Sequence, residues 1–317
     1  MDTDILLHIK RGNDNRMNKL QANICLLCVT LLWSTEVIIF ACIPNSVVPF
    51  ATTAITSLIG AVLLFLCFFK RIIAALKKGG KKILLTGILL SVLNCGYNVL
   101  YQYGLKEFDV STGAFTISMT VVILPVILMM KRQNVDKKTW ISAGLVLIGI
   151  VVSYLGKLGK ISIPGLLVLI GGCIIRAYYI IRLNDAAREY DPVAISAMIA
   201  LFVGIISFGI WFFMQPATFA AIEWNSQIIA SLFIHAYFIV MFAQTLNIFA
   251  QRNATPAAAT IIYSMEIIFS LIWGMTMPAD IVTPVTPDVF MLIGAAFIVL
   301  GNLSETIDFR KKAVKRL

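Results

Sequence analysis

The sequence predicts an all-α polytopic membrane protein with ten transmembrane helices arranged as two inverted five-helix repeats. Composition is the first reason: 59% of the residues are hydrophobic, 13% are charged and the mean hydropathy is +0.90. Soluble domains are about 45–50% apolar and about 25% charged. The other two reasons are a series of long apolar runs and a pattern in the first half of the chain that returns in the second half.

The apolar runs have about the length that crosses a hydrocarbon core of about 30 Å as a helix. The ten runs cover residues 21–42, 46–69, 83–104, 110–130, 140–156, 161–181, 193–214, 227–250, 256–275 and 288–303. Because the connections between them are short, we expect no soluble domain. The predicted division is a cytoplasmic N-terminal arm (1–20), a first repeat (21–156), a second repeat (161–303) and a basic cytoplasmic tail (304–317).

The first run carries Glu36, the first charge that lies well inside the predicted bilayer. Charged side chains at that depth cost about 2.5–3.5 kcal/mol on insertion scales, so they are functional candidates. The second run is rich in serine, threonine and glycine, which allows close packing against a neighbouring helix. Its hydroxyl groups can bond to carbonyl groups of their own helix, and we assign them no function.

The third and fourth runs supply candidates for the lining of a cavity. Asn94, Asn98 and Tyr101 follow an i, i+4, i+7 pattern that puts three polar groups on one helical face. That face would be costly in lipid, so it contacts either another helix or water. The fourth run adds the hydroxyl groups of Ser118 and Thr120. The fifth run has no internal charge, and we interpret it as scaffold.

The sixth and eighth runs add a cation and a histidine. Arg176 stays charged at any reachable pH, so it must meet a carboxylate, carbonyl groups, water or an anionic ligand. Tyr179 shares its helical face. The eighth run brings His235 and Gln244. A lone histidine is more often a hydrogen-bonded interior residue than a proton carrier, and both interpretations stay open. The seventh run is apolar and uninformative.

The ninth run contains Glu266, with Tyr263 one turn earlier on the same face. Residues 118–121 of the first half align with residues 264–267 at a constant offset, and polar residues on the flanks agree. The tenth run repeats the spacing of small residues in the fifth. Because five is odd, a second copy of the repeat would enter the membrane from the opposite side. Inverted repeats recur in secondary transporters, where the binding site lies near the midplane between them.

The basic residues predict the orientation. Most of the 26 lysine and arginine residues lie in the two terminal segments and in the connections that follow even-numbered runs, such as residues 70–82 and 131–138. This distribution predicts cytoplasmic N- and C-termini. The net charge of +10 is thus mainly an orientation signal. No nucleic-acid partner is expected, because the basic residues are dispersed and no aromatic platform interleaves them.

Several segments resemble a known family, namely LLWSTEVIIF, LYQYGLKEFDVSTGAFTISMTVVILPVI and LNIFAQRNATPAAATIIYSMEIIFSLIWG. They look like the EamA-like branch of the drug/metabolite transporter (DMT) superfamily, and the resemblance covers nearly the whole chain from Met17 to Leu303. It implies a plasma-membrane carrier in which the third, fourth, eighth and ninth helices surround a central cavity.

These observations predict a secondary active transporter that moves a small polar metabolite (an amino acid, an amine or a nucleoside-like solute) by alternating access. Glu36, Glu266, Arg176 and His235 are the candidates for substrate charge or proton coupling. A glutamate that meets Arg176 in only one conformation would exchange protons as the carrier switches, so the protein is predicted to be proton-coupled or an exchanger. The alternative is a permanent ion pair between a glutamate and Arg176 that only joins two helices.

Two rival functions come from other classes. An uncoupled facilitator or channel needs no coupling group, and a membrane-embedded transferase needs an acidic cluster or a set of histidine and aspartate residues. No aspartate lies inside a core helix segment, and no second pair or nearby histidine completes a metal site at Cys25 and Cys28. We therefore expect no enzyme activity, no catalytic or metal-binding residues and no cofactor. The expected partners are a small-molecule substrate and the lipid bilayer, and the choice between a monomer and a homodimer stays open.

Overall fold

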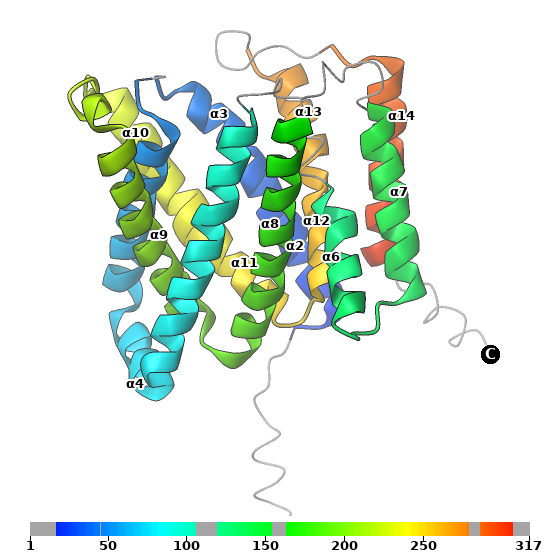
Figure 1. Ribbon diagram of the computed structural model, residues 1–317, viewed down its shortest axis with the longest axis horizontal. Helices are drawn as coiled ribbons and strands as arrows, with labels where there is room; N and C mark the ends of the chain where they lie inside the picture. The colour runs from blue at the N-terminus through cyan, green and yellow to red at the C-terminus, as the bar shows by residue number, and fades with distance from the viewer. Residues whose placement is uncertain (1–16, 45, 106–118, 154–162, 279–285, 307–317) are drawn as a thin grey trace, which may run out of the picture.

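The computed structural model describes residues 17–44, 46–105, 119–153, 163–278 and 286–306, and every regular element in these ranges is a helix. The first part of the chain forms α2 (Lys19–Ser34), α3 (Glu36–Ala41), α4 (Pro49–Leu105), α6 (Thr120–Met130) and α7 (Lys137–Ser153). The second part forms α8 (Ile163–Glu189), α9 (Pro192–Met214), η1 (Pro216–Phe219), α10 (Ser226–His235), η2 (Ala236–Ala243), α11 (Gln244–Gln251), α12 (Pro256–Tyr263), α13 (Met265–Thr276) and α14 (Val289–Thr306). Figure 1 shows the long helices side by side in one bundle.

The described helices make the chain a multi-pass membrane protein. Seven helical spans in these ranges are long and apolar enough to cross a membrane. Large hydrophobic side chains cover the outside of the bundle, with Leu66 75% exposed and Phe213 82% exposed, as expected of a surface that faces lipid. The count of ten transmembrane helices in two repeats stays a prediction. Helix α4 is counted as one span, and residues 110–118 of the fourth run lie outside the described residues.

Helix α4 bends at Gly80, where φ is 54° and ψ is −141°. Glycine adopts positive φ at little steric cost. Figure 1 shows two arms of α4 on either side of this bend, and they contain the second and third predicted runs. We expected a loop over residues 70–82. The structure instead has a kink at Phe68 (φ −127°, ψ 25°) and helix from there to the bend, because the stretch KRIIAALKK consists largely of good helix formers.

Helix α9 packs more extensively against α4 than against any other described element. Its start is fixed by Asp191, whose carboxylate accepts hydrogen bonds from the backbone N–H groups of Val193 and Ala194 at 3.0 Å and 3.2 Å. Such capping satisfies N–H groups that have no partner within the helix. The same carboxylate pairs with the Arg71 guanidinium at 2.9 Å, which ties the start of α9 to the first arm of α4.

Three described basic segments gather at one end of the bundle. Figure 1 shows the bend of α4, the α6–α7 connection and the α8–α9 connection at the end where α2 begins. This arrangement agrees with the basic segments sharing one side of the membrane. That this side is the cytoplasm stays a prediction, and the two terminal segments, residues 1–16 and 307–317, lie outside the described residues.

Helices α7 and α14 meet along a seam of small residues. A Cβ atom added to Gly149 would lie 2.6 Å from the carbonyl oxygen of Gly294 and 2.8 Å from Ile298 Cγ1. A Cβ atom added to Gly301 would lie 2.8 Å from the carbonyl oxygen of Ser142. The two backbones therefore approach closely, as small residues permit in membrane helices.

Candidate functional site

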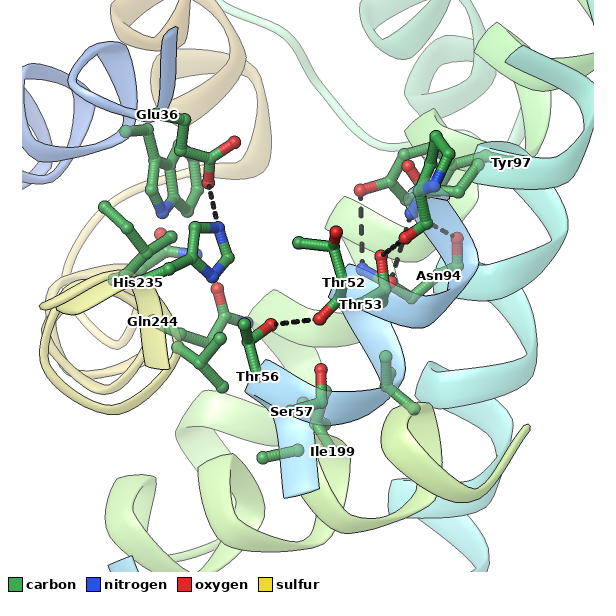
Figure 2. A pocket seen from close by; sticks show the side chains of 18 of the residues that line it. Glu36, Thr52, Thr53, Thr56, Ser57, Asn94, Tyr97, Ile199, His235 and Gln244 are labelled. Carbon is green, nitrogen blue, oxygen red and sulfur yellow. Dashed lines mark hydrogen bonds and ion pairs between the residues drawn. The ribbon is translucent and has the colours of Figure 1, made fainter. Parts of the chain in front are cut away.

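A cavity of about 640 Å³ lies inside the bundle. Its lining comes from α2, α3, both arms of α4, and from α8 to α13, so that residues distant in the sequence share one space. The volume is within the range of about 300–1,000 Å³ that is usual for small-molecule sites. Figure 2 shows one wall formed by α4 and an opposite wall that carries Glu36, His235 and Gln244.

The cavity brings together ten of the twelve residues that the sequence singled out. These are Glu36, Asn94, Asn98, Tyr101, Arg176, Tyr179, His235, Gln244, Tyr263 and Glu266. Thr120 is buried at the start of α6 and is not among the lining residues. Ser118 lies outside the described residues.

The two lining carboxylates both follow a break in a helix. The first span is interrupted at Thr35, and Glu36 lies in the first turn of α3. The ninth predicted run is interrupted at Ser264, and Glu266 lies in the first turn of α13. The start of a helix favours negative charge, because its free N–H groups and dipole are positive.

His235 approaches Glu36 across the cavity. Its Nε2 atom is 3.6 Å from Glu36 Oε1, and its ring stacks on Phe40 with centroids 5.1 Å apart. Neither ring nitrogen has a hydrogen-bond partner among the described residues, although the residue is only 7% exposed. The π-helix η2 begins directly after His235, and π-helical turns occur often at functional sites.

Arg176 faces an aromatic ring. Its Cζ atom lies 5.9 Å from the centroid of Tyr97, a distance at which a cation and a ring attract each other. Within the described ranges, no carboxylate oxygen lies within ion-pair distance of Arg176. The permanent pair between a glutamate and Arg176, which the sequence left open, is therefore not formed in this conformation.

Amides and tyrosines form the deeper part of the cavity. The Tyr263 hydroxyl donates to Asn247 Oδ1 at 2.5 Å and accepts from Gln251 Nε2 at 2.9 Å. Gln244 Nε2 donates to the Tyr179 hydroxyl at 3.2 Å. The ring of Trp33 lies 5.1 Å from that of Tyr263. These contacts join α2, α8, α11 and α12 around one polar centre.

Next to Gln251, side chains of α8 contact the end of α11. These contacts lie at the end of the bundle where the basic connections gather. Asn184 Nδ2 donates to the backbone carbonyl groups of Gln251 at 2.7 Å and Ala254 at 3.1 Å. Arg188 also donates to the Ala254 carbonyl at 3.1 Å. Asn184 is 2% exposed and Gln251 is fully buried. The α3–α4 connection, which supplies further lining residues, lies toward the opposite end of the bundle (Figure 1).

Some lining residues were missed by the sequence analysis. Thr52, Thr53, Thr56 and Ser57 form a hydroxyl-bearing wall on the first arm of α4, although we assigned the hydroxyl groups of this run no function. Their spacing of four residues, 52 with 56 and 53 with 57, is a signal that could have placed them on one face. Gln251 follows Gln244 at the i, i+7 spacing of one helical face and carries the same kind of signal.

The described residues contain no group of three or more histidine, cysteine, aspartate or glutamate side chains that could hold a metal ion. The six cysteines are free thiols. What the fold provides is a ligand-sized polar cavity enclosed by membrane-spanning helices, which is the arrangement of a solute transporter.

The chain belongs to the EamA-like transporter family, whose model matches residues 20–155 and 163–303. This confirms the resemblance found in the sequence. The chain is also 25% identical over 293 residues to an uncharacterized transporter of Archaeoglobus fulgidus, which covers 92% of this chain and 89% of the relative. A crystal structure with 18% identity and a TM-score of 0.69 covers 92% of this chain and 98% of its own, which shows a shared fold.

Proposed function

We propose that this membrane transporter is a secondary active carrier that moves a small polar metabolite across the plasma membrane by alternating access. The observation that carries the proposal is the cavity itself, where Glu36, Arg176, His235 and Glu266 line one space deep in an apolar bundle. Charged residues in membrane-spanning segments are costly and generally mark substrate or ion pathways. Amino acids, amines and nucleoside-like solutes fit the mixture of charged groups, amides and tyrosines.

The arrangement of the two ends supports a carrier over a channel. Asn184 and Arg188 join α8 to the chain around Ala254 at one end, while lining residues from the α3–α4 connection lie toward the other. A channel needs a path through both ends at once, whereas a carrier closes one end while the other is open. With the basic connections in the cytoplasm, the joined end is the cytoplasmic one.

Proton coupling is proposed at Glu266. Both Glu266 and Arg176 line the cavity, and the described residues contain no ion pair between them. A conformational change that brought the two side chains together would favour the ionised carboxylate, and separation would favour proton uptake. The coupling group would then gain and lose a proton once in each transport cycle.

The test is proton-linked current in liposomes that contain the purified protein, challenged with pooled amino acids, amines and nucleosides. A substrate-evoked current is expected in the natural protein and should be abolished in a folded Glu266→Gln variant that still binds the ligand. Glu223→Gln is the matched control, because Glu223 is exposed and does not line the cavity. Uptake that is unchanged in Glu266→Gln would remove the coupling role, and flux that never saturates would favour a channel.

A further inference from the structure

We propose that the cavity selects an organic monocation, namely a primary amine attached to an aromatic or apolar body, over an amino acid or a nucleoside. This inference rests on the proposed function and names the substrate class. It follows from which hydrogen-bonding groups of the lining are already used, from the charges in the cavity, and from its aromatic walls.

Two of the amides in the lining use both of their donor hydrogens within the protein. Asn98 Nδ2 donates both hydrogens within its own helix, to the backbone carbonyl of Asn94 at 2.9 Å and to Asn94 Oδ1 at 3.2 Å. Gln251 Nε2 donates both of its hydrogens, to Asn247 Oδ1 at 3.2 Å and to Tyr263 at 2.9 Å. An NH₂ group has two hydrogens to donate, so these two amides offer a ligand no donor.

Acceptors, in contrast, remain available. Gln251 Oε1 is buried and has no hydrogen-bond partner among the described residues. Thr53 and Thr56 use their hydroxyl hydrogens for the backbone carbonyls of Pro49 at 3.0 Å and Thr52 at 2.8 Å. Each hydroxyl oxygen keeps acceptor lone pairs. Leaving a buried acceptor unsatisfied is costly, so these oxygens favour a ligand that donates hydrogen bonds. An ammonium group offers three donors and no acceptor.

The charges point the same way. Two carboxylates, Glu36 and Glu266, line the cavity against one guanidinium, Arg176. With both carboxylates ionised and His235 neutral, the lining carries one negative charge in excess, and the guanidinium lies over the Tyr97 ring. A monocation would neutralise this excess, whereas a zwitterion or a neutral nucleoside would leave it in an apolar bundle where unpaired charge is costly.

Aromatic side chains provide faces for the cation and its body. Trp33 and Tyr263 have ring centroids 5.1 Å apart, and those of Tyr97 and Tyr179 are 5.9 Å apart. All four residues line the cavity. Aromatic faces attract cations and also pack against apolar ligand bodies. A volume of about 640 Å³ accommodates a one-ring amine with water around it.

The experiment compares tyramine with tyrosine, which have the same phenol ring and amino group and differ by one carboxylate. Binding is measured by titration calorimetry on the full chain in lipid nanodiscs. Tyramine is expected to bind at least about tenfold more tightly than tyrosine. Equal binding of the two, tighter binding of tyrosine, or tighter binding of a nucleoside would overturn the inference.

Variants locate the binding to this cavity. Glu36→Gln should weaken tyramine binding by about tenfold or more, because it removes a negative charge from the lining. Thr56→Val should weaken it several-fold. Thr30→Val is the matched control, because Thr30 is equally buried and donates to its own helix at the same 2.8 Å but does not line the cavity. Equal effects of both valine variants would overturn the assignment of the hydroxyl wall.

Binding and transport fail in different ways in this design. Saturable uptake of another solute class without tyramine binding would overturn the monocation inference and leave the carrier function standing. Tyramine binding without saturable uptake of any tested solute would support the inference and contradict the carrier function. Since calorimetry and liposome uptake use the same full chain, the two conclusions can be separated.

Discussion

Glu305 is a buried carboxylate that contacts other helices and does not line the cavity, unlike Glu36 and Glu266. It is 1% exposed near the end of α14, and its Oε2 atom accepts a hydrogen bond from Thr139 at 3.2 Å. Lys19 lies 3.8 Å from its Oε1 atom, and Lys138 donates to its backbone carbonyl at 2.9 Å. Glu305 therefore joins the starts of α2 and α7 to α14. Glu36 and Glu266 instead face open space.

Replacement of Glu305 should affect stability rather than ligand selection. Glu305→Ala leaves Thr139 and Lys19 without their acceptor, and removing one partner of a buried hydrogen bond costs about 1–3 kcal/mol. The expected result is a lower thermal unfolding temperature in detergent with unchanged relative affinity for amines and amino acids. Glu223→Ala is the control, since Glu223 is exposed. An unchanged unfolding temperature in Glu305→Ala would show that the contacts contribute nothing measurable.

A residue could be assigned to the site from the sequence when its polarity differs strongly from that of its neighbours in the chain. Glu36, Arg176, His235 and Glu266 are conspicuous as ionisable groups inside apolar runs, and all four line the cavity. Thr56 could not be assigned in this way, because a threonine in a membrane helix usually bonds to its own backbone, as this one does. That its oxygen also faces a ligand-sized space depends on the neighbouring helices.

At the scale of helices, the α7–α14 seam shows what spacing alone can predict. The sequence has the same spacing between Ser142 and Gly149 as between Gly294 and Gly301, and the structure packs these two sets of small residues against each other. The breaks at Thr35 and Ser264 had no such signal. Neither position is a glycine or a proline, and the η2 stretch AYFIVMFA is uniformly apolar, so its π-helical turns leave no mark in the sequence.

The seam gives a prediction with a control on the same helix. Gly149→Ala would place a Cβ atom 2.6 Å from the Gly294 carbonyl oxygen, so α7 and α14 must separate. Overpacking of this kind costs about 1–3 kcal/mol. Gly144→Ala has no atom within 4 Å of the added Cβ and should be neutral or stabilise by up to about 1 kcal/mol. Thermal unfolding in detergent measures both variants, and similar shifts would contradict the close approach.

At the scale of the whole molecule, the membrane class could be predicted because it depends on composition, which no packing detail alters. The contacts between Asn184 and the end of α11 could not be predicted from the sequence. Asn184 lies near the end of α8, among charged residues such as Asp185 and Arg188, where a polar residue is common. Its role becomes visible only when α8 lies beside the end of α11.

The contacts of Asn184 predict a shift between conformations. Asn184→Ala removes two hydrogen bonds at the joined end, so this end should open more often. In a background without the native cysteines, a cysteine at Ala254 should react several-fold faster with a membrane-impermeant maleimide applied from that side. Gln227→Ala is the control, because Gln227 contacts the Cys42 carbonyl in another part of the chain. Equal labelling rates would contradict a closing role for Asn184.

The π-helix η2 has a mechanical consequence for the span that contains it. A π-turn holds an extra residue relative to an α-turn. Loss of that residue from the turn would change the register by about 100° of rotation and about 1.5 Å along the axis. His235 precedes η2, whereas Gln244 and Asn247 follow it. A local change from π- to α-helical winding would therefore couple a short movement of α11 along its axis to a rotation about that axis. The amides of Gln244 and Asn247 would turn with α11, while the imidazole of His235 stayed in place.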